Sequence, residues 1–107
     1  MTSRAGDDVP VLACALDLEV RIPGSDSLKS KRSVVRHLLD GARSRFRVAS
    51  AEVGFQDQWQ RAELGFATVS GSAATAEAVL DAVERFVWSD PEVEVISASR
   101  HWVDTQR

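Results

Sequence analysis

Apolar and polar residues alternate from Val11 to Ile22, so that every second side chain is hydrophobic. A period of two is the pattern of a strand that buries one face. Pro23 and Gly24 end the alternation, and Ser27 is placed to accept a hydrogen bond from the first turn of a helix. The pattern therefore predicts a half-buried strand that leads through a tight turn into a helix.

Residues 28–46 have apolar side chains at the three- and four-residue spacing of a helix with one buried face. The predicted apolar stripe of this helix comprises Leu28, Val35, Leu38, Leu39, Ala42 and Phe46. The remaining predicted elements, in chain order, are strands over 47–55 and 61–70, a helix over 73–88 and a strand over 92–103.

The order of these elements, β-α-β-β-α-β with short connections, predicts the fold class. Two βαβ-type crossovers place both helices on one face of a four-stranded antiparallel sheet, which is a ferredoxin-like α+β sandwich. A chain of 107 residues supports one core. We therefore expect a single domain over 11–107, preceded by a short disordered lead at residues 1–10, which is small and polar.

Composition restricts the classes of protein that fit this chain. The single cysteine, Cys14, excludes an internal disulfide framework and a cysteine-cluster zinc site. No apolar run approaches the roughly 20 residues of a membrane span, and the first residues lack the apolar core of a signal peptide. The sequence predicts a cytoplasmic protein without a membrane, metal or cofactor site, and no catalytic constellation stands out.

Positive charge is concentrated in one segment. Residues 21–47 hold eight of the thirteen Lys and Arg residues but only two of the sixteen acids. Helical spacing gathers five of these cations along one flank of the predicted first helix: Lys29, Arg32, Arg36, Arg43 and Arg47. A clustered positive surface attracts phosphates, so these residues are the candidate nucleic-acid-binding site. The alternative is a solvated helix face in which pairs such as Arg36 and Asp40 absorb part of the charge.

Carboxylates form a second group of candidates. Alternation places four of them on the sheet face opposite the helices: Asp17, Glu19, Glu52 and Glu63. An acidic face without an aromatic pair repels phosphate, which argues against RNA binding through the open sheet. Carboxylates on adjacent strands are also candidate ligands of Mg²⁺ in a metal-dependent phosphoesterase. The alternative is a ladder of cross-strand ion pairs with Arg21, Arg61 and Arg100.

The connection between the second and third predicted strands is aromatic and rich in amides. Phe55, Gln56, Asp57, Trp59 and Arg61 combine residue types that are enriched at protein interfaces, and they are the candidate partner-binding patch. The alternative is local: the tryptophan folds over the hairpin, and the amides satisfy open backbone groups.

Two stretches of the chain carry a family resemblance. SLKSKRSVVRHLL at 27–39 and AEVGFQDQWQRAELG at 51–65 follow an initial strand that ends in RIPGS. In this order and spacing they resemble the YlxP-like family of small bacterial domains of unknown function, over about residues 11–103. The resemblance implies a ferredoxin-like fold. Genes of the family commonly lie beside those for a translation initiation factor and a ribosome-binding factor, so it also implies a role linked to translation or RNA.

The resulting hypothesis is a non-catalytic accessory protein that binds ribosomal RNA or the ribosome through the basic helix. One alternative is a self-associating interaction module, a homodimer that uses an edge strand or the open face and has no nucleic-acid role. The metal-dependent phosphoesterase is the other alternative.

Overall fold

The computed structural model describes residues 11–104; the predicted lead at 1–10 and residues 105–107 lie outside them. All six predicted elements are present in the predicted order. They are β1 (Leu12–Arg21), α1 (Leu28–Phe46), β2 (Ala49–Gly54), β3 (Arg61–Ser70), α2 (Ala73–Trp88) and β4 (Glu94–Asp104).

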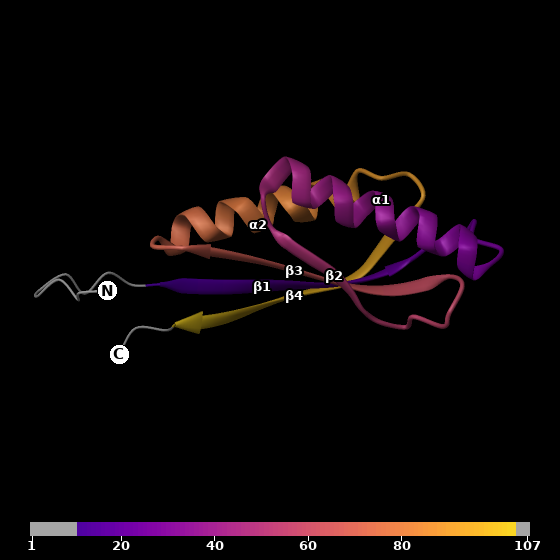
Figure 1. Ribbon diagram of the computed structural model, residues 1–107, viewed down its shortest axis with the longest axis horizontal. Helices are drawn as coiled ribbons and strands as arrows, with labels where there is room; N and C mark the ends of the chain where they lie inside the picture. Colours follow the sequence, from indigo (N-terminus) through magenta and orange to yellow (C-terminus); the bar gives the residue numbers. More distant parts are fainter. Residues whose placement is uncertain (1–10, 105–107) are drawn as a thin grey trace, which may run out of the picture.

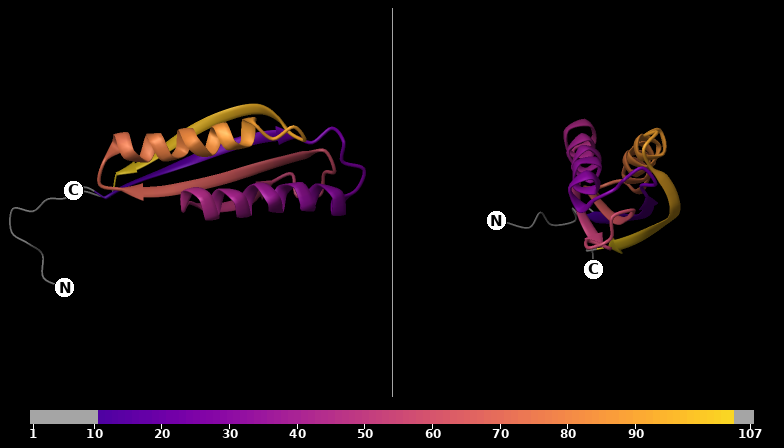
Figure 2. Two further views of the ribbon diagram at one scale, coloured as in Figure 1. Left: turned by 90° about the horizontal axis from the view of Figure 1, so that it is seen from above. Right: turned by 90° about the vertical axis from the view of Figure 1, so that its right-hand side faces the viewer.

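The strands form one antiparallel sheet in the order β2-β3-β1-β4. Both helices lie on the same side of this sheet, as the end-on view in Figure 2 shows, and the arrangement has two layers. Figure 1 shows α1 and the β2–β3 connection at the same end of the molecule. The predicted ferredoxin-like α+β sandwich is therefore confirmed, with β2 and β4 as the two edges.

The helix boundaries follow from their caps. Ser27 accepts a hydrogen bond from the amide of Ser30, and Ser72 accepts one from the amide of Thr75, as N-caps do. The C-cap of α1, Arg47, has a left-handed backbone with φ of 56°. A left-handed residue cannot belong to an extended strand, which is one reason why β2 is shorter than the predicted 47–55.

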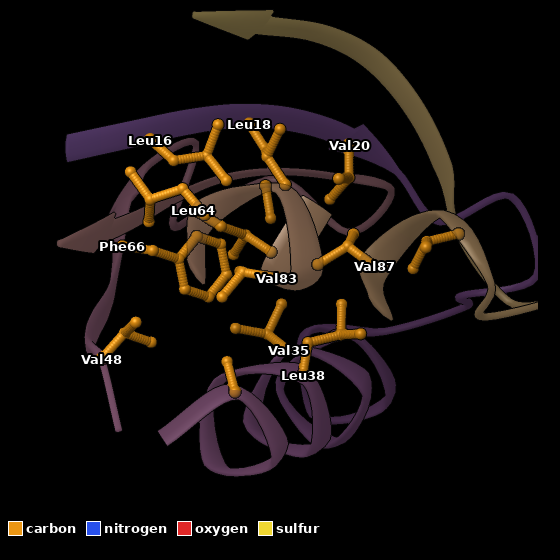
Figure 3. Close-up of a cluster of buried hydrophobic side chains, with 14 of the residues drawn as sticks. Leu16, Leu18, Val20, Val35, Leu38, Val48, Leu64, Phe66, Val83 and Val87 are labelled. Carbon is orange, nitrogen blue, oxygen red and sulfur yellow. The ribbon is translucent and has the colours of Figure 1, made fainter. Parts of the chain in front are cut away.

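The core lies between the sheet and the two helices (Figure 3). The alternate residues of β1 and β3 point toward the helices, and α1 and α2 close the layer from the other side. Its central residues are Leu16, Leu18, Val20, Leu64, Phe66, Val35, Leu38, Val83 and Val87. Full burial of each such side chain stabilises the fold by about 1.5–3 kcal/mol, so this layer fixes the position of α1 relative to the sheet.

The two helices approach closely at one glycine. A Cβ atom on Gly41 of α1 would lie 2.5 Å from Cζ of Phe86 on α2. The same phenylalanine ring meets Phe46 edge-on at 5.9 Å and lies under the guanidinium of Arg45 at 5.1 Å. A side chain at position 41 would therefore require the ring of Phe86 to shift. Within residues 11–104, no helix is long and apolar enough to cross a membrane.

Candidate nucleic-acid interface

The side chains of the predicted cation row are exposed on α1, as the helical spacing predicts. Lys29, Arg32 and Arg36 point away from the core within the first half of the helix. None of these three forms an ion pair with a carboxylate of residues 11–104. Their charge is therefore not neutralised within this part of the chain.

In the second half of the row, one cation, Arg43, interacts with other groups of the protein. Arg43 forms an ion pair with Asp40 and also donates from Nη1 to the carbonyl of Ser50 on β2, at 3.1 Å. The alternative of a solvated helix face named Asp40 as a possible partner of Arg36, but Asp40 pairs with Arg43. Arg43 thus holds the end of α1 against β2, while Arg47, the C-cap, remains exposed.

A trough runs beside the cation row. A cavity of about 690 Å³ lies between the start of α1, the β1–α1 loop and the α2–β4 connection, and Ser30, Ser33 and His37 line its helical side. A shallower hollow of about 480 Å³ continues along α1 and shares Ser33 and His37 with the first. Of the cation row, Arg36 lines the second hollow, and two carboxylates, Asp40 and Glu92, line the trough as well. Nε2 of the exposed His37 lies 3.9 Å from a carboxylate oxygen of Asp90.

Lys31, which the sequence analysis did not single out, is fully buried in the middle of this basic segment. Its Nζ donates to the carbonyls of Phe55 at 2.8 Å, Gln56 at 3.2 Å and Arg61 at 3.2 Å. It also lies 2.8 Å from Oε2 of Glu52. This one side chain ties the start of α1 to the β2–β3 hairpin. The sequence contains a signal for this burial. At helical spacing, position 31 falls on the apolar stripe that includes Leu28, Val35 and Leu38.

The position of Glu52 corrects a prediction. It was expected on the open face of the sheet, but it lies opposite the buried Leu64 in the register of β2 and β3, and its carboxylate reaches the helix side. The prediction was wrong because most residues of β2 are small or polar, so their alternation does not identify which face of the strand is buried. Glu52 therefore serves as the counter-ion of Lys31.

The remaining carboxylates stay on the open face. Glu19 pairs with Arg61, as the ion-pair alternative predicts. A hydrogen bond with Asp17 and the repulsion of its charge raise the pKa of Glu63. Arg100 departs from the predicted ladder, because it lies on the helix side and bonds to carboxylates of α2.

Glu52 is therefore separated from the three other carboxylates that the phosphoesterase alternative grouped with it, because it lies on the other face of the sheet. Within residues 11–104, no group of three or more His, Cys, Asp or Glu side chains is arranged to hold a metal ion.

Hydrogen bonds and a cation–π contact hold the tip of the β2–β3 hairpin in place. Phe55 has a left-handed backbone with φ of 59°, which is a strained conformation for a bulky residue. Its carbonyl accepts from the amide of Gln58 at 3.0 Å as well as from Lys31, and the guanidinium of Arg61 lies over its ring at 4.2 Å. Nε2 of Gln60 reaches the carbonyl of Ser25 at 3.0 Å.

Of the predicted partner-binding patch, the rigid tip leaves Gln56, Asp57 and Trp59 exposed. Trp59 retains 54% of its accessible surface and does not fold over the hairpin. Phe55 and Arg61 are instead engaged with each other. The patch lies at the same end of the molecule as the start of α1, because Lys31 joins the two.

Fold and surface together define a small α+β domain with a basic helix and a fixed hairpin tip, and the comparisons with known proteins agree. The family described as "Protein of unknown function (DUF503)" matches residues 13–100. The "Uncharacterized protein YlxP" of Bacillus subtilis (strain 168) is 37% identical over 86 residues, which cover 80% of this chain and 94% of that protein. The chain belongs to this family, and the predicted resemblance is confirmed.

Proposed function

We propose that this protein is a non-catalytic cytoplasmic accessory factor linked to translation, which binds structured RNA or the ribosome through α1. The observation that carries the proposal is the row of Lys29, Arg32 and Arg36. Their side chains are exposed without a carboxylate partner in residues 11–104, and Arg36 also lines a hollow along α1.

The chemistry of this surface suits a phosphate backbone. Arginine presents a planar fork of donors that matches two phosphate oxygens, and lysine adds a point charge. Serine hydroxyls in the trough are placed to bond to ribose hydroxyls, which distinguish RNA from DNA. Three or four such contacts give a salt dependence with a slope of roughly −2 to −3 for single strands. The affinity is expected to be modest, because the whole chain carries a net charge of −3.

The orientation of the complex also follows from the charges. The open face carries Asp17, Glu19 and Glu63, so it turns away from the nucleic acid. Trp59 stands near the start of α1 and adds a flat apolar surface at one end of the basic row. Aromatic side chains of this kind stack on unpaired bases or anchor a protein partner.

Two matched pairs of arginines test the proposal. Arg32→Ala with Arg36→Ala removes two charges from the row, and Arg21→Ala with Arg85→Ala removes two exposed charges from elsewhere. Affinity for a labelled fragment of structured ribosomal RNA is measured by fluorescence anisotropy across a salt series. We expect the first variant to bind more weakly and its salt slope to flatten by roughly 0.7 for each phosphate that is no longer neutralised. Equal losses of affinity in both variants would show that only net charge matters and would overturn the assignment to α1.

A further inference from the structure

β4 is one of the two edge strands of the sheet. β4 has eleven residues, and within residues 11–104 it pairs only with β1. The other edge, β2, has six residues, and Arg43 and Ser50 tie it to α1 through hydrogen bonds. A long edge strand presents a row of unpaired backbone donors and acceptors that readily pair with another strand. β4 contains no lysine or proline, and its one irregularity is a bulge at Ile96, between Val95 and Ser97.

Large apolar side chains flank this edge. Trp88 is 59% exposed, Ile96 45% and Trp102 43%. Trp88 is on the same stripe of α2 as Asp81 and Glu84, whose carboxylates bond to Arg100 on β4. The tryptophan therefore lies on the side of α2 that faces the β4 edge. Trp88 and Trp102 thus leave large apolar surfaces exposed beside the strand, and tryptophan is enriched at protein interfaces.

We infer that the β4 edge is a homodimer interface, in which β4 pairs antiparallel with β4 of a second copy. The polar side chains of the strand support a second copy as the occupant, because a carboxylate and an imidazole can hydrogen-bond to each other. Glu94 pairs with Arg21 of β1, and His101 pairs with Ala15, so both point to the open face. We place the two-fold axis of the antiparallel pair at Ala98 and leave the bulged Ile96 unpaired. Glu94 of each copy then lies beside His101 of the other copy.

The position of Trp88 on α2 is consistent with a two-fold axis at Ala98. Trp88 lies one turn beyond Glu84, about 6 Å along α2. The long side chain of Arg100 on β4 reaches both Asp81 and Glu84, and Ala98, two strand residues from Arg100, lies about 6.6 Å further along β4. Trp88 is thus close to the level of Ala98, where it would meet Trp88 of the second copy. Fully desolvated aromatic side chains at the centre of an interface commonly dominate its binding energy.

The inferred dimer is independent of the RNA proposal but compatible with it. Pairing at β4 extends the sheet across the two-fold axis. α1 packs against β2, at the opposite edge of the sheet (Figure 1). Each copy would therefore present its basic row at an outer end of the dimer, away from the interface.

Sedimentation equilibrium of the full chain over a wide range of concentration tests the inference. The mass is expected to rise from 11.7 kDa toward twice that value. We expect Trp88→Ala to weaken the dimer at least tenfold. The matched control is Trp59→Ala, which removes a similarly exposed tryptophan from the β2–β3 connection, outside β4 and α2, and should leave dimerisation unchanged.

A charge exchange tests the register itself. Glu94→Lys alone should weaken the dimer, and Glu94→Lys combined with His101→Glu should restore it. Circular dichroism checks that each variant is folded. A wild type that stays monomeric at every concentration overturns the inference and leaves the edge to a strand of another protein. A dimer that survives Trp88→Ala but not Trp59→Ala overturns it as well, in favour of the hairpin tip.

Discussion

Lys31 is expected to be the most costly residue to replace in the basic segment. It is the one cation of α1 that is fully buried, and its ammonium group holds three carbonyls and one carboxylate. In Lys31→Met the side chain keeps most of its volume but loses the charge and every donor. The Glu52 side chain, 17% exposed, would then be a nearly buried charge without a counter-ion.

The expected magnitude follows from this unpaired charge. Breaking a buried ion pair by removing one partner costs about 3–5 kcal/mol, because the remaining charge is not compensated. Total stabilities of small domains are about 5–15 kcal/mol, so Lys31→Met removes a large fraction of the free energy of unfolding. For a domain of this size the melting temperature should fall by roughly 12 °C or more.

The assay is urea unfolding followed by circular dichroism, with two companion variants. Lys29→Met removes an exposed charge two residues away and should change stability by at most about 0.5 kcal/mol. Glu52→Gln combined with Lys31→Met should be less damaging than Lys31→Met alone, because no buried charge is left unpaired. Equal stabilities of Lys29→Met and Lys31→Met would refute the reasoning.

Two further variants test local features. Gly41→Ala should lower the free energy of unfolding by about 1–3 kcal/mol, since its Cβ meets the ring of Phe86, and Phe86→Leu should relieve part of that destabilisation in thermal unfolding. Asp17→Asn should raise stability at neutral pH, because it removes the repulsion that raises the pKa of Glu63. That gain should shrink as the pH falls below the folded-state pKa of Glu63, where the protonated side chain is already favourable. Unfolding curves that show the same gain at every pH would contradict this account.

The fold was predictable because its apolar spacing is regular. The alternation of β1 and the helical stripe around Val35 and Leu38 identify which face of each element is buried. β2 is different: its one large apolar residue, Val53, is 54% exposed, so alternation alone cannot tell its faces apart. Glu52 was therefore assigned to the wrong face of the sheet.

The candidate site was predictable only in part. Helical spacing groups the exposed cations, but it does not show that Arg43 bonds to the carbonyl of Ser50, because that hydrogen bond joins two elements. Lys31 lies on the apolar stripe, yet a charged residue in a basic segment is expected in solvent unless a buried partner is known. The trough is formed with Pro91 and Glu92, which are distant from α1 in sequence.

Co-sedimentation with purified ribosomal subunits across a salt series tests the central claim most directly. The account predicts that the wild type binds saturably to one subunit and is released as salt rises. Arg32→Ala with Arg36→Ala should bind poorly, whereas Arg21→Ala with Arg85→Ala should bind like the wild type. Absence of binding at low salt, or equal binding by all three proteins, would contradict the proposal that α1 contacts ribosomal RNA.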